Sequence, residues 1–458
     1  MKKILTIGVL LSAINTQAMT EQNFVEQLRV THPFFKQQAL SSEIKQVEKQ
    51  ATTANEDWVV AVDGTYQSEK NARNAGVVAY DKLSTASIGV STTKKHVATG
   101  SDITIKHIWT DKNNDIERTR NQFSVDYSYP LLRNNGGVND RLSGDVADIA
   151  IAKNTLERLE AEEDFILKKL ARFVDLAYAQ AQLKINEQRL TLAAKELALV
   201  KEKYAASVVD KVDVLLQQDA YQRAKQKRLQ AQQELTLLRH EIAITLNFDF
   251  EKVVADIDLY KTYTPEVIAL KGYLIENSRV LKISDLAKNT LKRQLRSFKN
   301  QSKVQLNLNF GLSSAGENTD YSNSINNQST TWKMGLGLSY PLGGTKSNSD
   351  ITKANMQLSN LEQSKQGQLL NIYTQAKTLK EKIQSLKEML ASNEVQFDIA
   401  KARTAEEKQR YTNGNGQASF VISAQNNEQV VELNYAQTAK NYQKAVFEFK
   451  ATIDQLVR

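Results

Sequence analysis

The amino-acid sequence predicts a mainly α-helical protein with β-hairpins, built from two copies of one structural unit. Two long stretches, 141–264 and 349–458, contain no proline, a residue that costs about 3 kcal/mol in a helix interior. We therefore expect both stretches to be helical almost throughout. Alternating apolar and polar residues, typical of strands, precede each stretch. The segment Ser128-Tyr129-Pro130-Leu131 recurs as Ser339-Tyr340-Pro341-Leu342, which indicates an internal duplication.

Apolar residues in both stretches recur at seven-residue steps, which predicts long coiled-coil helices packed against partner helices. In the first stretch the predicted seam is Leu176, Leu183, Leu190, Leu197 and Tyr204, with Ala179, Ala193 and Val200 at the half-steps. In the second it is Tyr435, Tyr442, Phe449 and Leu456, flanked by Ala424, Val431 and Ala445. A helix from Arg141 to Ala206 would be roughly 100 Å long, so it needs neighbours along its whole length.

The composition agrees with elongated helices that have one solvated face. Of the 458 residues, 41% are hydrophobic and 24% are charged, and the mean hydropathy is −0.47. The formal net charge is +8, but Lys and Arg are interleaved with Glu, Gln and Ala along the helices. This pattern predicts solvated helix faces and no nucleic-acid partner.

Residues 1–18 have the pattern of a secretory signal peptide. Lys2 and Lys3 precede an apolar run from Ile4 to Ile14, and Thr16-Gln17-Ala18 supplies a small-residue cleavage site. We therefore expect an exported protein. The sequence contains no cysteine, so we expect no N-terminal lipid anchor and no disulfide. No later segment is a candidate transmembrane helix, so membrane insertion would have to use strands.

Residues 23–54 are predicted to form a helix that Pro33 bends or divides. The period then changes to two, and strict alternation predicts strands with one apolar and one polar face. The strong strand predictions are 58–66, 122–131, 304–312 and 332–340. Two weaker segments, 86–92 and 103–109, are joined by the turn-prone residues 98–101. They predict an extra hairpin that either crosses a bilayer or projects beyond it.

The strong strands are roughly ten residues long, which a tilted strand needs to cross a membrane. Their ends carry Trp58, Tyr129, Trp332 and Tyr340, which suit the aromatic girdles at membrane interfaces. A soluble β-sandwich would show the same alternation. If the strands span a membrane, lipid tolerates no open sheet edge, so several chains must share one barrel.

The order of these parts resembles the TolC-type outer membrane efflux protein (outer membrane factor) family. The residues that carry the resemblance are 129–137, at the step from strand to helix, and the helical hairpins 204–246 and 411–453. The resemblance implies a homotrimer whose 12-stranded barrel, with four strands per chain, is continuous with an α-helical tunnel through the periplasm. It also implies an equatorial belt that includes 247–299, a periplasmic adaptor (membrane fusion) protein and an inner-membrane transporter.

The predicted organisation is a signal peptide (1–18), a first structural repeat (19–264) and a second (265–458). We expect a trimeric outer membrane channel-tunnel that exports substrates from a tripartite efflux pump or a type I secretion system. The alternative is an exported coiled-coil stalk or adhesin with a soluble β head. Four scattered histidines and no cysteine predict neither an enzyme nor a metal or cofactor site.

The resemblance places the periplasmic entrance of the tunnel at Tyr204, Asp213, Tyr411, Gly414 and Gly416. In a trimer, Asp213 would form three carboxylates near the axis, which favour cations. In the second repeat Phe420 and Ser423 stand where family members often have acidic residues. Gly414 and Gly416 are better interpreted as turn glycines than as adaptor contacts.

Overall fold

The computed structural model describes residues 18–70, 82–113, 117–264, 269–340 and 342–456. The signal peptide predicted at 1–18 therefore lies almost entirely outside the described residues. The chain divides into two compact units. One, the helical unit, comprises Met1–Ala39, Glu157–Leu281 and Gly367–Arg458, and the other, the strand unit, comprises Leu40–Leu156 and Lys282–Gln366.

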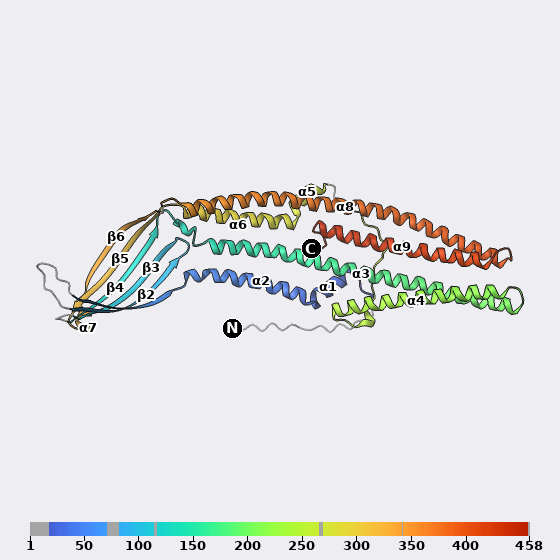
Figure 1. Ribbon diagram of the computed structural model, residues 1–458, viewed down its shortest axis with the longest axis horizontal. Helices are drawn as coiled ribbons and strands as arrows, with labels where there is room; N and C mark the ends of the chain where they lie inside the picture. Colours follow the sequence, from blue (N-terminus) through green and yellow to red (C-terminus); the bar gives the residue numbers. More distant parts are fainter. Residues whose placement is uncertain (1–17, 71–81, 114–116, 265–268, 341, 457–458) are drawn as a thin grey trace. The chain divides into compact units, whose positions relative to one another are not determined.

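The strand unit contains one antiparallel sheet in the order β1-β2-β3-β4-β5-β6 (Figure 1). The strands are β1 (Val59–Lys70), β2 (Lys82–His96), β3 (Ser101–Asn113), β4 (Arg118–Pro130), β5 (Gln305–Asn318) and β6 (Ser329–Ser339). All predicted strands are confirmed, and the weak segments 86–92 and 103–109 form β2 and β3. The described sheet contains six strands, two more than the four per chain that the resemblance implies for the barrel.

The pairing register places most of the large apolar residues of the six strands on one face. Val62 lies opposite Val90, Ile105 opposite Val125 and Leu308 opposite Leu336. Directly opposite residues of antiparallel strands share a face, and alternation carries that face along each strand. The other face carries small and polar side chains such as Ser91, Ser124 and Asn307.

The step from β4 to the following helix is held by side-chain amides. Asn134 adopts φ 66°, its backbone N–H donates to Asn300 Oδ1 at 2.7 Å, and its side-chain amide donates to Asp140 Oδ2 at 2.7 Å. Arg293 donates to Asp145 Oδ2 and to the carbonyl of Val138, both at 2.6 Å. These bonds fix the exit from the sheet. Shorter elements of the strand unit are η1 (Thr52–Glu56), η2 (Asn135–Gly137) and α7 (Tyr321–Asn326).

Long helices dominate the rest of the described chain: α3 (Leu142–Ala205), α4 (Lys211–Leu246), α8 (Thr345–Thr412) and α9 (Ala418–Thr452). Their lengths are 64, 36, 68 and 35 residues, so a longer helix precedes a shorter one in both halves. The remaining helices are α1 (Glu21–Thr31), α2 (Pro33–Ala51), η3 (Phe250–Lys252), α5 (Leu270–Asn277) and α6 (Arg279–Gln301). None of the described helices is apolar over a length that would cross a membrane.

Two helix limits follow from the backbone preferences of single residues, proline and asparagine. The predicted division at Pro33 is confirmed, because α1 ends at Thr31 and α2 begins at Pro33. The stretch 141–264 is not helical throughout, because α4 ends at Leu246, the limit expected for the first helical hairpin, and Asn247 is left-handed with φ 50°. A left-handed residue after the last turn commonly ends a helix, and asparagine tolerates that conformation.

The residues after α4 pack across the helical unit instead of extending the helix. The side-chain amide of Gln180 clamps Ala255, donating to its carbonyl at 3.1 Å and accepting from its N–H at 2.8 Å. Met19 pairs with Ala255 as an isolated parallel bridge. The buried Tyr442 hydroxyl accepts from Tyr263 N–H at 2.7 Å and donates to its carbonyl at 2.9 Å.

The second predicted seam is confirmed in part, because Tyr442 and Phe449 are fully buried and Ala424, Val431 and Ala445 are buried beside them. Tyr435 is half-buried, as is Leu456, which lies beyond the end of α9. The seam predicted for α3 is shifted. The half-step residues Ala179, Ala193 and Val200 are buried together with Leu176, whereas Leu183, Leu190 and Leu197 are half-buried and Tyr204 is exposed. Small side chains let neighbouring helices approach closely, so in this single chain they take the innermost positions.

Candidate functional site

The ends of the two helical hairpins contain all five residues predicted at the entrance. The first hairpin turns between Ala205 of α3 and Lys211 of α4, and the second between Thr412 of α8 and Ala418 of α9. Tyr204 lies in the last turn of α3 and is 46% exposed. Asp213 lies in the first turn of α4, where its N–H donates to the Asp210 carbonyl at 3.1 Å.

Glycine is required at two positions of the second hairpin, 414 and 416, for different structural reasons. Gly414 adopts φ 79°, a left-handed conformation that costs other residues about 1–2 kcal/mol, so its interpretation as a turn glycine is confirmed. Gly416 lacks a positive φ, but a Cβ there would lie 2.9 Å from Tyr411 N. Gly416 is therefore required by close backbone approach.

Tyr411 is the centre of a charged cluster at these hairpin ends. Lys203 Nζ lies 4.4 Å from the centre of its ring, a cation–π contact. Its hydroxyl is buried and has no hydrogen-bond partner among the described residues. Burial raises the pKa of Tyr411, and the negative charges of Asp213 and Glu196 raise it further. The structure thus places Tyr411 within the electrostatic reach of Asp213, whereas Tyr204 points to solvent.

A band of buried polar side chains crosses α3, α4 and α9 above the hairpin ends. Gln429 donates to Asn186 Oδ1 at 2.9 Å, Lys227 donates to Gln429 Oε1 at 3.3 Å, and Gln425 donates to Glu196. The band comprises Asn186, Arg189, Glu196, Gln217, Gln425 and Gln429, all buried. Buried polar groups are costly unless they are paired, so this band specifies how the helices align.

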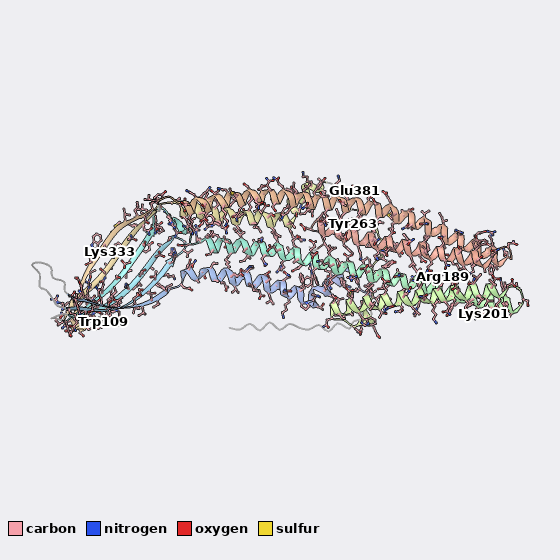
Figure 2. The ribbon with its side chains drawn as sticks, in the orientation of Figure 1. Trp109, Arg189, Lys201, Tyr263, Lys333 and Glu381 are labelled. Atoms are coloured by element: carbon pink, nitrogen blue, oxygen red, sulfur yellow. The ribbon has the colours of Figure 1, made fainter. Side chains whose placement is uncertain are left out.

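Arg189 is the cationic member of the band (Figure 2). Its guanidinium donates to Asn426 Oδ1 at 3.3 Å, while its Nε and one terminal nitrogen have no partner among the described residues. Burial lowers the pKa of Arg189, and the nearby carboxylates of Glu196 and Glu428 act against that shift. The heptad pattern contains the signal for this band, because Gln182, Arg189 and Glu196 recur every seven residues among apolar positions.

Three carboxylates of the helical unit lie close enough to suggest a metal site. Single oxygens of Glu160, Glu163 and Asp454 lie within 4.8 Å of one another. Arg279 occupies their centre, with Nε 2.6 Å from Glu160 and a terminal nitrogen 3.2 Å from Asp454, and it also pairs with Glu163. The guanidinium already pairs with all three carboxylates, so the cluster is an internal ion-pair network.

Aromatic residues lie at both ends of the sheet. At the end where the chain passes to the helices are Trp58, Tyr129 and Tyr340, and at the opposite end are Trp332 and two residues not singled out above, Tyr66 and Trp109. Trp58 is followed along β1 by Tyr66, eight residues later, which at about 3.3 Å per residue is roughly 26 Å. The predicted interface aromatics therefore occupy two separate rows.

The fold has solved counterparts at very low sequence identity. The structure of CusC, whose study concerns transmembrane channel formation, matches with a TM-score of 0.70 and 11% identity over 97% of this chain and 95% of that chain. The outer membrane protein VceC of Vibrio cholerae matches with 0.66 and 12% over 94% and 95%. The CmeC outer membrane channel of Campylobacter jejuni matches with 0.65 and 11% over 98% and 91%. No family model and no curated protein sequence matches the chain.

These likenesses define the class of fold. The chain has the fold of the TolC-type outer membrane channels, which confirms the resemblance seen in the sequence. The match extends over nearly the whole chain, including the sheet and the long helical hairpins.

Proposed function

We propose that the protein is a trimeric outer membrane channel-tunnel that exports substrates across the periplasm and the outer membrane. The proposed working partners are a periplasmic adaptor protein and an inner-membrane transporter, belonging to a tripartite efflux pump or a type I secretion system. In this proposal the signal peptide at 1–18 directs export, and the protein consists of the structural repeats 19–264 and 265–458. The conduit performs no chemistry.

The observation that carries the proposal is the apolar face of the sheet. Its side chains remain exposed in the single chain, with Val60 66%, Leu336 68% and Leu338 71% exposed. A soluble protein would bury a face of this size, because large exposed apolar patches mark interaction surfaces. Lipid is the contact that suits strands with aromatic residues at both ends.

The edges of the sheet support assembly from several copies. β1 and β6 are the outermost strands, and every residue of both is exposed. An unpaired strand edge in the hydrocarbon core would leave backbone N–H and C=O groups without partners. We therefore propose that β6 of one copy pairs with β1 of the next, in a closed barrel of three chains.

The hairpin ends are the proposed entrance and the proposed contact with the inner-membrane partners. They expose apolar side chains that a docking protein would cover, namely Val208, Val212, Leu215 and Phe420. Three copies of Asp213 would favour cations near the axis, with Tyr411 and Lys203 beside them. Phe420 stands where family members often have an acidic residue, so we propose a single acidic ring at the entrance rather than two.

The alternative of an exported stalk or adhesin with a soluble β head is less well supported. Such a head needs a second layer over its apolar face. The exposed fractions of Val60, Leu336 and Leu338 provide no sign of that layer within the described residues.

The decisive experiment is fractionation followed by mass measurement of the unboiled, detergent-extracted protein. We expect the protein in the outer membrane fraction, with a particle mass of three chains and conductance in planar bilayers. A soluble monomer would refute the proposal and favour the stalk.

A further inference from the structure

We propose that the hairpin β2–β3 forms part of the membrane-spanning wall, so that three copies of the six-stranded sheet close a barrel of eighteen strands. This inference rests on the proposed trimeric channel and goes beyond it, because the resemblance implies twelve strands. The competing arrangement is a hairpin that leaves the sheet and projects beyond the membrane.

The strands β2 and β3 are as long as the neighbouring strands of the sheet. β2 has 15 residues and β3 has 13, against 13 in β4 and 14 in β5. The β2–β3 pairing runs without interruption from Ser84 opposite Asn113 to His96 opposite Ser101. The flanking pairings with β1 and β4 are equally continuous. The hairpin therefore separates β1 from β4 over their whole length.

The apolar face of the sheet continues across the inserted strands. Ile88 lies opposite Trp109 and Val90 opposite His107, and Ile103 and Ile105 lie opposite Tyr127 and Val125 on β4. Ile88 and Val90 are 51% and 45% exposed. His107 is a polar residue of this face, and its ring stacks on Phe123 at 4.1 Å. Thr92, Lys94 and Asp111 are further polar residues on the same face. A projection into water would have no need of this apolar row in register with the lipid-facing rows of β4 and β5.

The opposite face of the hairpin suits a water-filled interior. It carries Ser87, Gly89, Ser91, Thr93, Thr104, Lys106, Ile108 and Thr110. Thr93 and Thr104 join their hydroxyls across the two strands at 3.0 Å. Its charged residues are Lys95, Lys106, Lys112 and Asp102, with Lys95 opposite Asp102. The side chains between them are mostly small and neutral, so this face leaves room for hydrated cargo.

The turn of the hairpin is anchored at the level where β4 passes into the helices. A Cβ on Gly100 would collide with the Asn134 carbonyl oxygen, and one on Gly137 would collide with the Val97 carbonyl oxygen. Lys95 Nζ lies 3.4 Å from Asp140 Oδ1 and 3.9 Å from Asp102 Oδ1.

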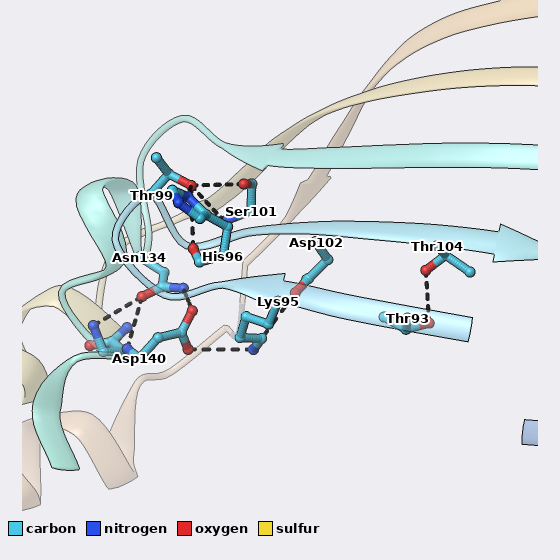
Figure 3. A network of polar contacts seen from close by, with 10 residues as sticks. Thr93, Lys95, His96, Thr99, Ser101, Asp102, Thr104, Asn134 and Asp140 are labelled. Atoms are coloured by element: carbon cyan, nitrogen blue, oxygen red, sulfur yellow. Dashed lines mark hydrogen bonds and ion pairs between the residues drawn. The ribbon is translucent and has the colours of Figure 1, made fainter. Parts of the chain in front are cut away.

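Figure 3 shows the contact between the hairpin turn and the residues after β4, with the turn residues His96, Thr99 and Ser101 beside Asn134 and Asp140. His96 Nδ1 lies 2.8 Å from Thr99 Oγ1, and the Thr99 and Ser101 hydroxyls lie 2.7 Å apart. The hairpin thus starts and ends within the height of the sheet.

A wider passage follows from the strand count. Barrel diameter grows roughly linearly with the number of strands, and barrels of 16–18 strands leave an aqueous channel. Eighteen strands would give about 1.5 times the diameter of twelve at the same tilt. We infer that the outer membrane part admits bulkier hydrophilic cargo than a twelve-stranded barrel would.

The absence of cysteine from the sequence allows single-cysteine spin labelling of the full-length protein in lipid vesicles. The test positions are Val90→Cys and Ile105→Cys on the apolar face, and Ser91→Cys and Lys106→Cys on the polar face. Leu308→Cys and Asn307→Cys on β5 are the matched controls. We would compare collision of each label with oxygen, which concentrates in lipid, and with a water-soluble nickel chelate.

The expected result is that labels at Val90 and Ile105 collide preferentially with oxygen, as the label at Leu308 does. Labels at Ser91 and Lys106 should collide preferentially with the chelate, as at Asn307. Chelate-dominated collisions at Val90 and Ile105, with Leu308 still in lipid, would overturn the inference and leave the channel intact. If Leu308 also contacts water, the proposed channel fails, and this inference fails with it.

Electron cryomicroscopy of the unsubstituted protein in detergent gives an independent count that no variant can disturb. Eighteen strands in a trimeric barrel would support the inference. Twelve strands, with residues 82–113 outside the wall, would overturn it.

Discussion

Asp126 on β4 and Lys333 on β6 form an ion pair of 3.3 Å across the intervening strand β5. Gly311 of β5 lies between them, and a Cβ there would lie 2.7 Å from Asp126 Oδ1 and collide with Lys333. Glycine at 311 therefore leaves the space through which the pair forms. The pair is on the polar face of the sheet, so in the proposed barrel it borders the lumen with zero net charge.

Breaking this pair is expected to change ion selectivity more than stability. Asp126→Asn leaves three unpaired lysines in a trimer and should shift the reversal potential toward anion preference, whereas Lys333→Gln should shift it toward cations. Exposed pairs contribute only about 0–1 kcal/mol, so both variants should still assemble. Bilayer recordings under a salt gradient measure the shift. The double variant is the control and should resemble the parent. Shifts of the same sign in both single variants would argue against a lumen position.

Removal of Arg279 should strongly destabilise the helical unit. Arg279→Met leaves Glu160, Glu163 and Asp454 without their shared cation, and loss of one partner of a buried ion pair costs about 3–5 kcal/mol. Burial raises the pKa of Glu160, so mild acidification should protonate this group readily. The difference in melting temperature between variant and parent should therefore become smaller. Thermal melting followed by helical circular dichroism at neutral and mildly acidic pH measures both effects. Lys271→Met, at an exposed position of α5, is the control. Equal melting of the two variants would contradict the role assigned to Arg279.

The band of buried amides allows a test of polar pairing. Asn186→Leu should cost about 1–3 kcal/mol, because it leaves the Gln429 side-chain amide without its 2.9 Å acceptor. Replacing both partners by leucine should cost less than the sum of the two single changes, because neither amide then remains without the other. Denaturant unfolding of the three variants completes the cycle. Strict additivity would mean that the two amides do not stabilise each other.

Two glycines of α8 and its following turn should respond in opposite directions to alanine. Gly414 has φ 79°, so Gly414→Ala should destabilise by about 1–2 kcal/mol. Gly367 lies inside α8 with open space around its Cβ position, so Gly367→Ala should stabilise by up to about 1 kcal/mol. Paired melting curves compare the two. A stabilising Gly414→Ala would show that the turn adopts another conformation in solution.

Alkaline pH should destabilise the fold partly through Tyr260. Burial, reinforced by Tyr435 whose ring centre lies 4.5 Å away, raises the pKa of Tyr260 from 10.0 to about 12. Between these values the unfolded chain loses the phenol proton while the folded chain keeps it, so stability falls as pH rises through this range. Tyr260→Phe should unfold at a higher pH than the parent. Tyr204→Phe, at an exposed ring, controls for loss of a hydroxyl, and an equal shift in both variants would refute the assignment.

Local patterns of the sequence were sufficient for the strands and for several helix limits. The alternation from Leu306 to Leu312 and from Trp332 to Tyr340 predicted β5 and β6, because side-chain direction in a strand has a strict period of two. Pro33 predicted the division between α1 and α2. The expectation that 141–264 is helical almost throughout fails after Leu246. There Asn247 has a left-handed backbone, and Gln180 clamps Ala255, a contact between residues 75 positions apart.

The sequence by itself determined the period, the length and the order of the elements, and with them the class of fold. Those features depend on each residue and its near neighbours. Tertiary structure alone decided that Ala179 rather than Leu183 is innermost, that Arg279 fills the space between three carboxylates, and that β2 and β3 lie between β1 and β4. These outcomes depend on which distant side chains approach one another, a relation that no local period contains.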